Sequence, residues 1–365
     1  MSFIHNSTSD HTLYVLGGSS TYQTQISEAL LSFYNVGVYQ APNKLLDQIE
    51  NVQPSAVIVD EVINGGDSLG FIEKFKVRHG HRQIPVVLTA SVTRAAAMRG
   101  YVKIPVLEKP YRRSQLLELI SHQVNKGIEA SWKKIEPVQR AALENTLNSY
   151  NSIADSIAEG RTLNYSDVTK SCEPLIQAVK NNAFQDMLRA VRGHDNYSYV
   201  HSLRVATLLS MFGAAIGIQG GDHETLTTGG LLHDVGKMKI PLQILNKPGK
   251  LDQHEFEQMK QHVPHSVGYL QLTHNIPKGV IIIAHQHHER INGSGYPNGL
   301  MGKELNQLAR MAAIIDVFSA LTDRRAYKPP MAAERALTWM NDMGGLDSSL
   351  LSVFKQMLLD SVPES

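Results

Sequence analysis

Short apolar runs alternate with segments of helical periodicity along residues 1–127. The runs TLYVLGG, SAVIVDE, IPVVLTA and IPVLEKP predict strands, and YQTQISEALLSFY and SLGFIEKFKVRHG predict helices between them. This alternation is typical of an α/β domain built on a doubly wound parallel sheet. In such folds functional groups collect where strands end, which is where Asp60, Thr89 and Lys109 stand.

The rest of the chain has helical periodicity without convincing strands. Residues 165–365 are predicted to form an all-α domain, joined to the first domain by a helical connector at residues 128–164. The connector helix should begin near Pro137 and stop at Gly160. Its apolar face packs either on its own domain or on the same helix of a second subunit, which would make a homodimer; the sequence leaves both open. That face consists of Val138, Leu143, Leu147, Tyr150, Ile153 and Ile157.

Composition narrows the protein class. A chain of 365 residues with 42% apolar and 19% charged residues suits two globular domains. A formal net charge of +1 argues against a broad surface for a nucleic-acid polymer or a membrane. The single Cys172 fits a reducing compartment, and the opening residues do not resemble a signal peptide, so we expect a cytoplasmic protein.

The amino-terminal pattern resembles a response-regulator receiver domain. Asp60 matches the phosphoacceptor of that family, and Thr89 and Lys109 match the residues that contact the phosphoryl group. The resemblance also implies an acidic pair after the first strand, but Gly17 and Gly18 stand there. Without those carboxylates a magnesium ion loses most of its oxygen ligands. We therefore predict a degenerate receiver in which Asp60 is a doubtful phosphoacceptor.

Histidine and aspartate recur on apolar backgrounds in the helical part. His201 shares a helical face with Val205, Leu208 and Phe212, a pattern that taken alone is more typical of a core histidine than of a ligand. Similar residues follow in four further segments: His233 and Asp234, His262, His287 and His288, and Asp316. Burying so many polar groups without partners would cost several kcal/mol each by rough estimate. Convergence on cations would remove that cost, and imidazoles with carboxylates suit iron, manganese, nickel or zinc.

The order and spacing of four motifs resemble the HD-GYP group of the HD phosphohydrolase superfamily. The motifs are LLHDVGK, ILNKPGKL, HHERINGSGYP and ARMAAIIDVFSALTDRRAYK. The resemblance implies an all-helical phosphodiesterase that opens cyclic di-GMP, or a mixed GMP–AMP ring, by in-line attack of a metal-activated hydroxide. It also implies metal ligands with Asp234 as the bridging one, namely His201, His233, Asp234, His262, His287, His288 and Asp316.

The same resemblance assigns substrate contacts. Lys237 would touch a phosphate oxygen, Arg325 and Lys328 would hold phosphates or guanine, and Tyr296 would contact substrate. The loop with Tyr296 is also a candidate contact for a diguanylate cyclase or another signalling protein.

Three positions depart from the family pattern. Tyr197 replaces a glutamate found in members with three metals, which predicts two divalent transition-metal ions here, iron or manganese before nickel or zinc. Ser319 replaces an aspartate near the substrate pocket and leaves the preferred base open, while Ala326 replaces a proline.

Two other functions compete with the phosphodiesterase. A non-catalytic sensor of cyclic dinucleotides, or of a partner protein, fits the degenerate receiver. A mononucleotide nucleotidase of the HD type is disfavoured by the segments around His288 and Arg325.

Overall fold

The computed structural model describes residues 2–4, 11–30, 34–100, 103–191, 194–245, 247, 249–323 and 330–361. The chain divides into two compact units: Met1–Ser131 with Gly193–Asn196, and Trp132–Arg192 with Tyr197–Ser365. Across the described ranges, no helix has the length and apolar character needed to span a membrane.

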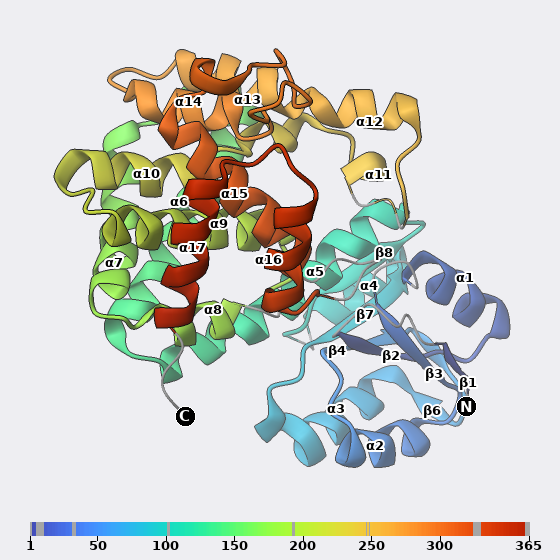
Figure 1. Ribbon diagram of the computed structural model, residues 1–365. Coiled ribbons are helices and arrows are strands. Elements are labelled where there is room, and N and C mark those ends of the chain that lie inside the picture. The colour runs from blue at the N-terminus through green and yellow to red at the C-terminus, as the bar shows by residue number, and fades with distance from the viewer. Residues whose placement is uncertain are drawn as a thin grey trace. The chain divides into compact units, whose positions relative to one another are not determined.

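The amino-terminal unit, blue to cyan in Figure 1, is built on a 6-stranded sheet in the order β1-β3-β2-β4-β7-β8. Its strands are β1 (Ser2–Ile4), β2 (Thr12–Leu16), β3 (Asn35–Tyr39), β4 (Ala56–Asp60), β7 (Val86–Ser91) and β8 (Val106–Lys109). Only β1 is antiparallel to its neighbour. The five parallel strands follow the 2-1-3-4-5 order of flavodoxin-like doubly wound sheets. The predicted α/β class is therefore confirmed, and β3 is a strand that the sequence pattern did not reveal.

Helices cover both faces of this sheet. They are α1 (Ser20–Leu30), α2 (Pro42–Asn51), α3 (Ser68–His79), α4 (Val92–Arg99) and α5 (Arg113–Ser131), with a 3₁₀ turn η1 (Gly80–Arg82) and a small ribbon of β5 (Val62–Ile63) and β6 (Gly66–Asp67). Leu45, Phe71 and Met98 bring α2, α3 and α4 onto one face, while Ile26 and Ile120 bring α1 and α5 onto the other. Strands buried on both faces explain why their sequences are continuous apolar runs.

The second unit is helical, as predicted. Among its described residues from Trp132 onward, the β structure is limited to an isolated bridge between Asn292 and Met301. Its elements are η2 (Trp132–Lys134), α6 (Pro137–Ala158), α7 (Tyr165–Lys180), α8 (Phe184–Val191), α9 (Tyr197–Ala215), α10 (Gly220–Leu232), η3 (Val235–Lys239), α11 (Leu242–Leu245), α12 (Gln253–Lys260), α13 (His262–Gln271), α14 (Lys278–Gln286), η4 (Gly302–Glu304), α15 (Gln307–Thr322), α16 (Ala333–Asp342) and α17 (Ser348–Asp360).

Two helices form the centre of this unit. Nearly all residues of α9 from Tyr199 to Gly213 and of α15 from Met311 to Ser319 are buried, and the two helices pack on each other. Helix α10 packs on α9, and α14 packs on α10, α13 and α15. Polar side chains on α9 and α15 are thus held in an apolar surrounding, where each needs a partner.

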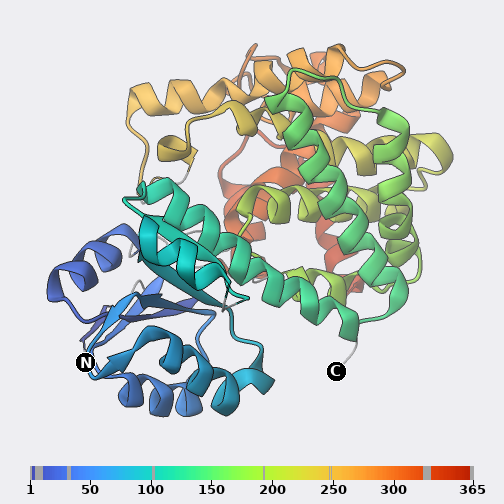
Figure 2. The same ribbon diagram turned by 180° about the vertical axis from the view of Figure 1, so that it is seen from behind.

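The connector helix lies inside the helical unit. Helix α6 begins at Pro137 and ends at Ala158, two residues before Gly160. Its buried positions include Leu143, Leu147 and Tyr150, and it packs along α7, as Figure 2 shows from behind. Of the two alternatives for this apolar face, the structure shows packing on its own unit.

Candidate metal centre

Seven buried or nearly buried side chains converge in the helical unit, and they are the seven predicted from the sequence. They come from α9, from the end of α10, from the start of α13, from the turn after α14 and from α15. They form two groups whose candidate ligand atoms lie within 4.8 Å of one another: Asp234, His262, His287 and His288, and His201, His233 and Asp316. No other described residues form such a group.

A close backbone approach places Asp234 next to His262. A Cβ on Gly236 would lie 2.1 Å from the backbone oxygen of His262 and 2.5 Å from the backbone nitrogen of Ser266. Only glycine fits there, and its N–H donates to Ser266 Oγ at 2.8 Å. Because of this close contact η3 packs directly on α13, and Asp234 Oδ1 lies 3.2 Å from His262 Nε2.

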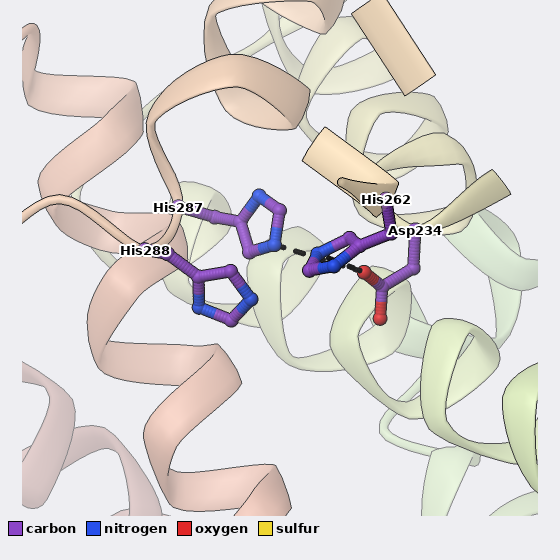
Figure 3. A group of neighbouring side chains, drawn as sticks. All are labelled: Asp234, His262, His287 and His288. Carbon is purple, nitrogen blue, oxygen red and sulfur yellow. Dashed lines mark ion pairs between the residues drawn. The ribbon is translucent and has the colours of Figure 1, made fainter. Parts of the chain in front are cut away.

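The first group is centred on Asp234 (Figure 3). His262 and His287 both point toward this carboxylate, and His287 Nε2 lies 3.7 Å from Oδ1. The rings of His287 and His288 are 4.0 Å apart between centroids, as neighbours on the turn that follows α14. The adjacent histidines therefore face one cluster together.

Both carboxylates reach the two groups. Asp234 Oδ2 lies 3.1 Å from His233 Nε2 and 3.8 Å from His201 Nε2, whereas Oδ1 is the oxygen near His262. Asp316 Oδ1 is 3.1 Å from His201 Nε2, and its Oδ2 is 3.4 Å from His288 Nδ1. A carboxylate whose two oxygens face different ligand groups has the arrangement of a bridging ligand.

Three of the imidazoles are held with one nitrogen aimed into the cluster. The Nδ1 atoms of His233, His262 and His287 lie 2.8, 2.6 and 3.1 Å from the backbone oxygens of Gly230, Met259 and Ala284. These contacts favour the tautomer in which Nδ1 carries the proton and Nε2 is free to bind a metal. Four buried atoms have no hydrogen-bond partner among the described residues: the Nε2 atoms of these three histidines and Asp234 Oδ1. Buried polar atoms left in this way fit a metal cation, so the donor set can hold one.

The electrostatics favour the same protonation states. Burial, with the charge of His233, lowers the pKa of His287 to about 3. Burial also lowers the pKa of His288. Burial acts to raise the pKa of Asp234, but the charges of His233 and Lys237 hold it well below its usual value. A neutral His287 and His288 beside an ionised Asp234 are the forms in which these side chains bind metals. At His201 burial acts to lower the pKa, but the hydrogen bonds with Asp316 and Asp323 raise it.

Residues 171–350 match the family model described as HD domain. They belong to the HD domain family. Several known proteins are similar to the chain. Cyclic di-GMP phosphodiesterase PA4108 of Pseudomonas aeruginosa is 36% identical over 164 residues, which are 45% of this chain and 39% of the relative. The 3'3'-cGAMP-specific phosphodiesterase 1 of Vibrio cholerae is 35% identical over 170 residues, 46% of this chain and 39% of the relative.

A third relative is similar along both units. The cyclic di-GMP phosphodiesterase response regulator RpfG of Xanthomonas campestris pv. campestris is 28% identical over 309 residues, 82% of this chain and 74% of the relative. The chain spans about two fifths of the length of the first two relatives and about three quarters of the third. The family match and these relatives confirm the resemblance to the HD-GYP group.

Two further predicted positions of the HD domain lie at the cluster. Lys237 Nζ forms an ion pair with Asp234 Oδ2, and its side chain is 16% exposed. Tyr197 stands one helical turn before His201, and the two rings stack at 5.9 Å with an interplanar angle of 19°. The aromatic ring thus stands at the position for which the family resemblance implies a carboxylate in members with three metals.

Three substrate contacts predicted for the HD domain stay predictions. Arg325 and Lys328 lie outside the described residues, as does Ala326. Ser319 is fully buried on α15, one turn after Asp316, and its hydroxyl has no partner among the described residues. Its burial gives no support to a direct contact with substrate.

Asp323, which was not predicted from the sequence, contacts the candidate ligand His201. Asp323 Oδ2 lies 3.0 Å from His201 Nδ1, and Asp323 Oδ1 accepts a hydrogen bond from Arg204 Nη1 at 2.6 Å. A carboxylate behind a histidine fixes the orientation of its ring and raises its basicity. The signal was present, because Asp323 follows Asp316 by two helical turns and so lies on the same face.

The backbone of the loop after His288 is held by a second carboxylate, Glu289, which was not predicted from the sequence. Glu289 is 1% exposed and accepts hydrogen bonds from the backbone N–H groups of Asn298 at 2.7 Å and Leu300 at 3.0 Å. The loop closes back on the site, so that the ring of Tyr296 lies 4.6 Å from that of His288. Tyr296 is therefore adjacent to the cluster, as its predicted contact with substrate requires.

The receiver-like unit has its own polar cluster at the carboxyl ends of its strands. Asp60 is 4% exposed; its Oδ2 pairs with Lys109 and accepts from Thr89 Oγ1 at 3.0 Å, and its Oδ1 accepts from the backbone N–H of Val62 at 2.9 Å. The structure thus brings together the three residues that the receiver resemblance selected, and both carboxylate oxygens have donors within this unit.

Proposed function

We propose that the HD domain of this chain is a metal-dependent phosphodiesterase that opens a cyclic dinucleotide to its linear form. The observation that carries the proposal is the convergence of five histidines and two carboxylates around imidazole nitrogens that have no hydrogen-bond partner among the described residues. The relatives named for activity on cyclic di-GMP and on 3'3'-cGAMP support the substrate class. Cyclic di-GMP is the first candidate substrate, and the mixed ring is the second.

We further propose two metal ions. Asp234 and Asp316 each present their two oxygens to different groups of histidines, which supports two neighbouring ions that share carboxylates. Tyr197 offers a phenol where a third ion would need a carboxylate. Imidazole-rich sites with few carboxylates suit iron, manganese, nickel or zinc better than magnesium or calcium.

The residues of the site divide the work of cleavage. When bound, a metal pair supplies a nucleophilic water of lowered pKa and positive charge at the phosphoryl oxygens. Asp234 and Asp316 would hold the pair in place together with the histidines. Lys237 adds an ammonium group next to Asp234, where it can stabilise negative charge that develops on a phosphoryl oxygen. The loop with Tyr296 lies beside His288, where the Tyr296 ring can contact a bound substrate.

The test combines metal analysis with product analysis. Purified protein is analysed for metals and then incubated with cyclic di-GMP and with 3'3'-cGAMP, and the products are separated by chromatography. We expect two transition-metal ions per chain and a linear dinucleotide product from at least one ring. Asp234→Ala should lose both metal and turnover, while Asp342→Ala, an exposed carboxylate on α16, should keep both.

Two results would overturn parts of this proposal. Full activity of Asp234→Ala would place the active site elsewhere. Metal-loaded wild-type protein that binds a ring tightly but cleaves neither would favour the sensor function over the enzyme.

A further inference from the structure

Helix α12 carries side chains that the core does not use. None of its residues is buried, although it contains the aromatic residue Phe256, which is 45% exposed. The helix is held instead by a capping box between Asp252 and Glu255 and by an ion pair of Glu255 with Lys247. In Figure 1, α12 lies at the edge of the helical unit beside α13. Packing of the core therefore does not explain why an aromatic residue stands on this helix.

Phe256 faces the metal cluster through Tyr296. The rings of Phe256 and Tyr296 meet edge to face, with centroids 6.3 Å apart at 81°. Tyr296 in turn lies 4.6 Å from the ring of His288. The two aromatic rings thus continue outward from a candidate metal ligand toward solvent.

Lys260 joins these rings from the same helix. It lies four residues after Phe256, on the same helical face, and its Nζ is 5.4 Å from the Phe256 ring and 5.8 Å from the Tyr296 ring. Lys260 forms an ion pair with Glu257 at 2.8 Å, and the Lys260 side chain is 25% exposed and the Glu257 side chain 55%. An ammonium group that lies over two rings and pairs with a largely solvated carboxylate can bind a phosphate, because an exposed ion pair of this kind contributes little free energy.

The ledge formed by Phe256, Lys260 and Tyr296 has a fixed place relative to the cluster. His262 follows Lys260 by two residues, and His262 Nδ1 lies 2.6 Å from the backbone oxygen of Met259 in the last turn of α12. The end of α12 and a candidate metal ligand are therefore held as one piece.

We propose that this ledge is the subsite for the half of the cyclic dinucleotide that is not being cleaved. Phe256 stacks with a nucleobase, and Lys260 contacts the second phosphate while the first lies at the metals. Every base has a π-face, and stacking on an aromatic side chain is a general means of holding one. The inference rests on the proposed phosphodiesterase function and adds residues that determine which diesters are good substrates.

The test separates the ledge from the metal site by comparing two substrates. Kinetics are measured on cyclic di-GMP and on methyl p-nitrophenyl phosphate, which has neither a nucleobase nor a second phosphate. We expect Phe256→Ala and Lys260→Ala each to raise KM for the ring about tenfold, as loss of one stacking or charged contact does. Hydrolysis of the small diester and metal content should stay at the wild-type level.

Matched controls lie in the same unit. Leu272→Ala removes an exposed apolar side chain, and Lys355→Ala removes an exposed lysine on α17. The subsite is overturned if the ledge variants match these controls on the ring, or if they lose metal and both activities together. If wild-type protein cleaves neither diester, the proposed function fails. The subsite is then tested by calorimetric measurement of cyclic di-GMP binding, and weaker binding by the ledge variants, but not by the controls, supports it. Equal binding, or no binding by wild type, overturns it.

Discussion

The phenol oxygen of Tyr22 lies 2.8 Å from the hydroxyl oxygen of Thr89, so that a side chain of α1 reaches the residue that donates to Asp60. A Cβ on Gly17 would meet the Tyr22 ring at 2.6 Å and stand 3.6 Å from Asp60 Cβ. The ring therefore occupies the space in which a carboxylate at position 17 would face Asp60. Lys109 Nζ lies 4.9 Å from the centroid of the same ring.

We predict from this arrangement that acetyl phosphate and magnesium do not phosphorylate Asp60. No carboxylate at positions 17 or 18 can share a magnesium ion with Asp60, and the oxygens of Asp60 already have donors. Intact-mass measurement should show no phosphate-sized gain over the unmodified mass in either wild type or Asp60→Ala. A phosphate-sized mass gain in wild type that Asp60→Ala lacks would contradict the prediction.

The contact between Asp323 and His201 gives a prediction about metal affinity. Asp323→Ala should weaken metal binding by about 10- to 100-fold, because His201 loses the carboxylate that orients its ring. Competition with a chelator measures this change without any assay of activity. Asp342→Ala, on the exposed end of α16, should leave the affinity unchanged. Wild-type affinity in Asp323→Ala would mean that the helices alone orient His201.

The fold and the candidate ligands could be predicted from the sequence because each changes the pattern of apolar residues along the chain. A strand buried on both faces gives a continuous run, and α15 reveals Asp316 as a carboxylate among apolar residues. Strand β3 was not predicted because Asn35 and Gly37 interrupt its run of apolar residues. Periodicity within one element is thus what a single sequence reports well.

Contacts between distant segments were not readable in this way. Nothing in the sequence around Tyr22 indicates that its ring reaches Thr89, which is 67 residues away. The same holds for Phe256 and Tyr296, which meet only because α12 and the loop after α14 fold onto one cluster. Their positions depend on packing, which no local pattern records.

Metal binding should stabilise the helical unit. In chelated protein the buried Nε2 atoms of His233, His262 and His287 have no hydrogen-bond partner among the described residues, whereas a bound ion supplies one. At an ion concentration of about 100 times Kd the unfolding free energy should rise by about 2.7 kcal/mol. Denaturant titration of chelated and manganese-loaded protein measures the difference, and Asp234→Ala should show none. An equal gain in that variant would locate the stabilising ion outside the cluster.

Lys237 is predicted to act on the reaction and not on metal binding. Its ammonium group pairs with Asp234, but a lysine at neutral pH is no metal ligand, and its side chain is the more exposed partner at 16% against 1%. Lys237→Ala should therefore keep the metal content and lower kcat by roughly 10²- to 10³-fold, as loss of one positioned donor to a developing oxyanion does. Lys239→Ala is the matched control, because this exposed lysine follows two residues later on the same 3₁₀ turn. Steady-state kinetics on the ring, with metal analysis of each variant, distinguish the possible roles. Loss of metal from Lys237→Ala would show that the ammonium group holds Asp234 in place, and an unchanged kcat would remove Lys237 from the catalytic residues.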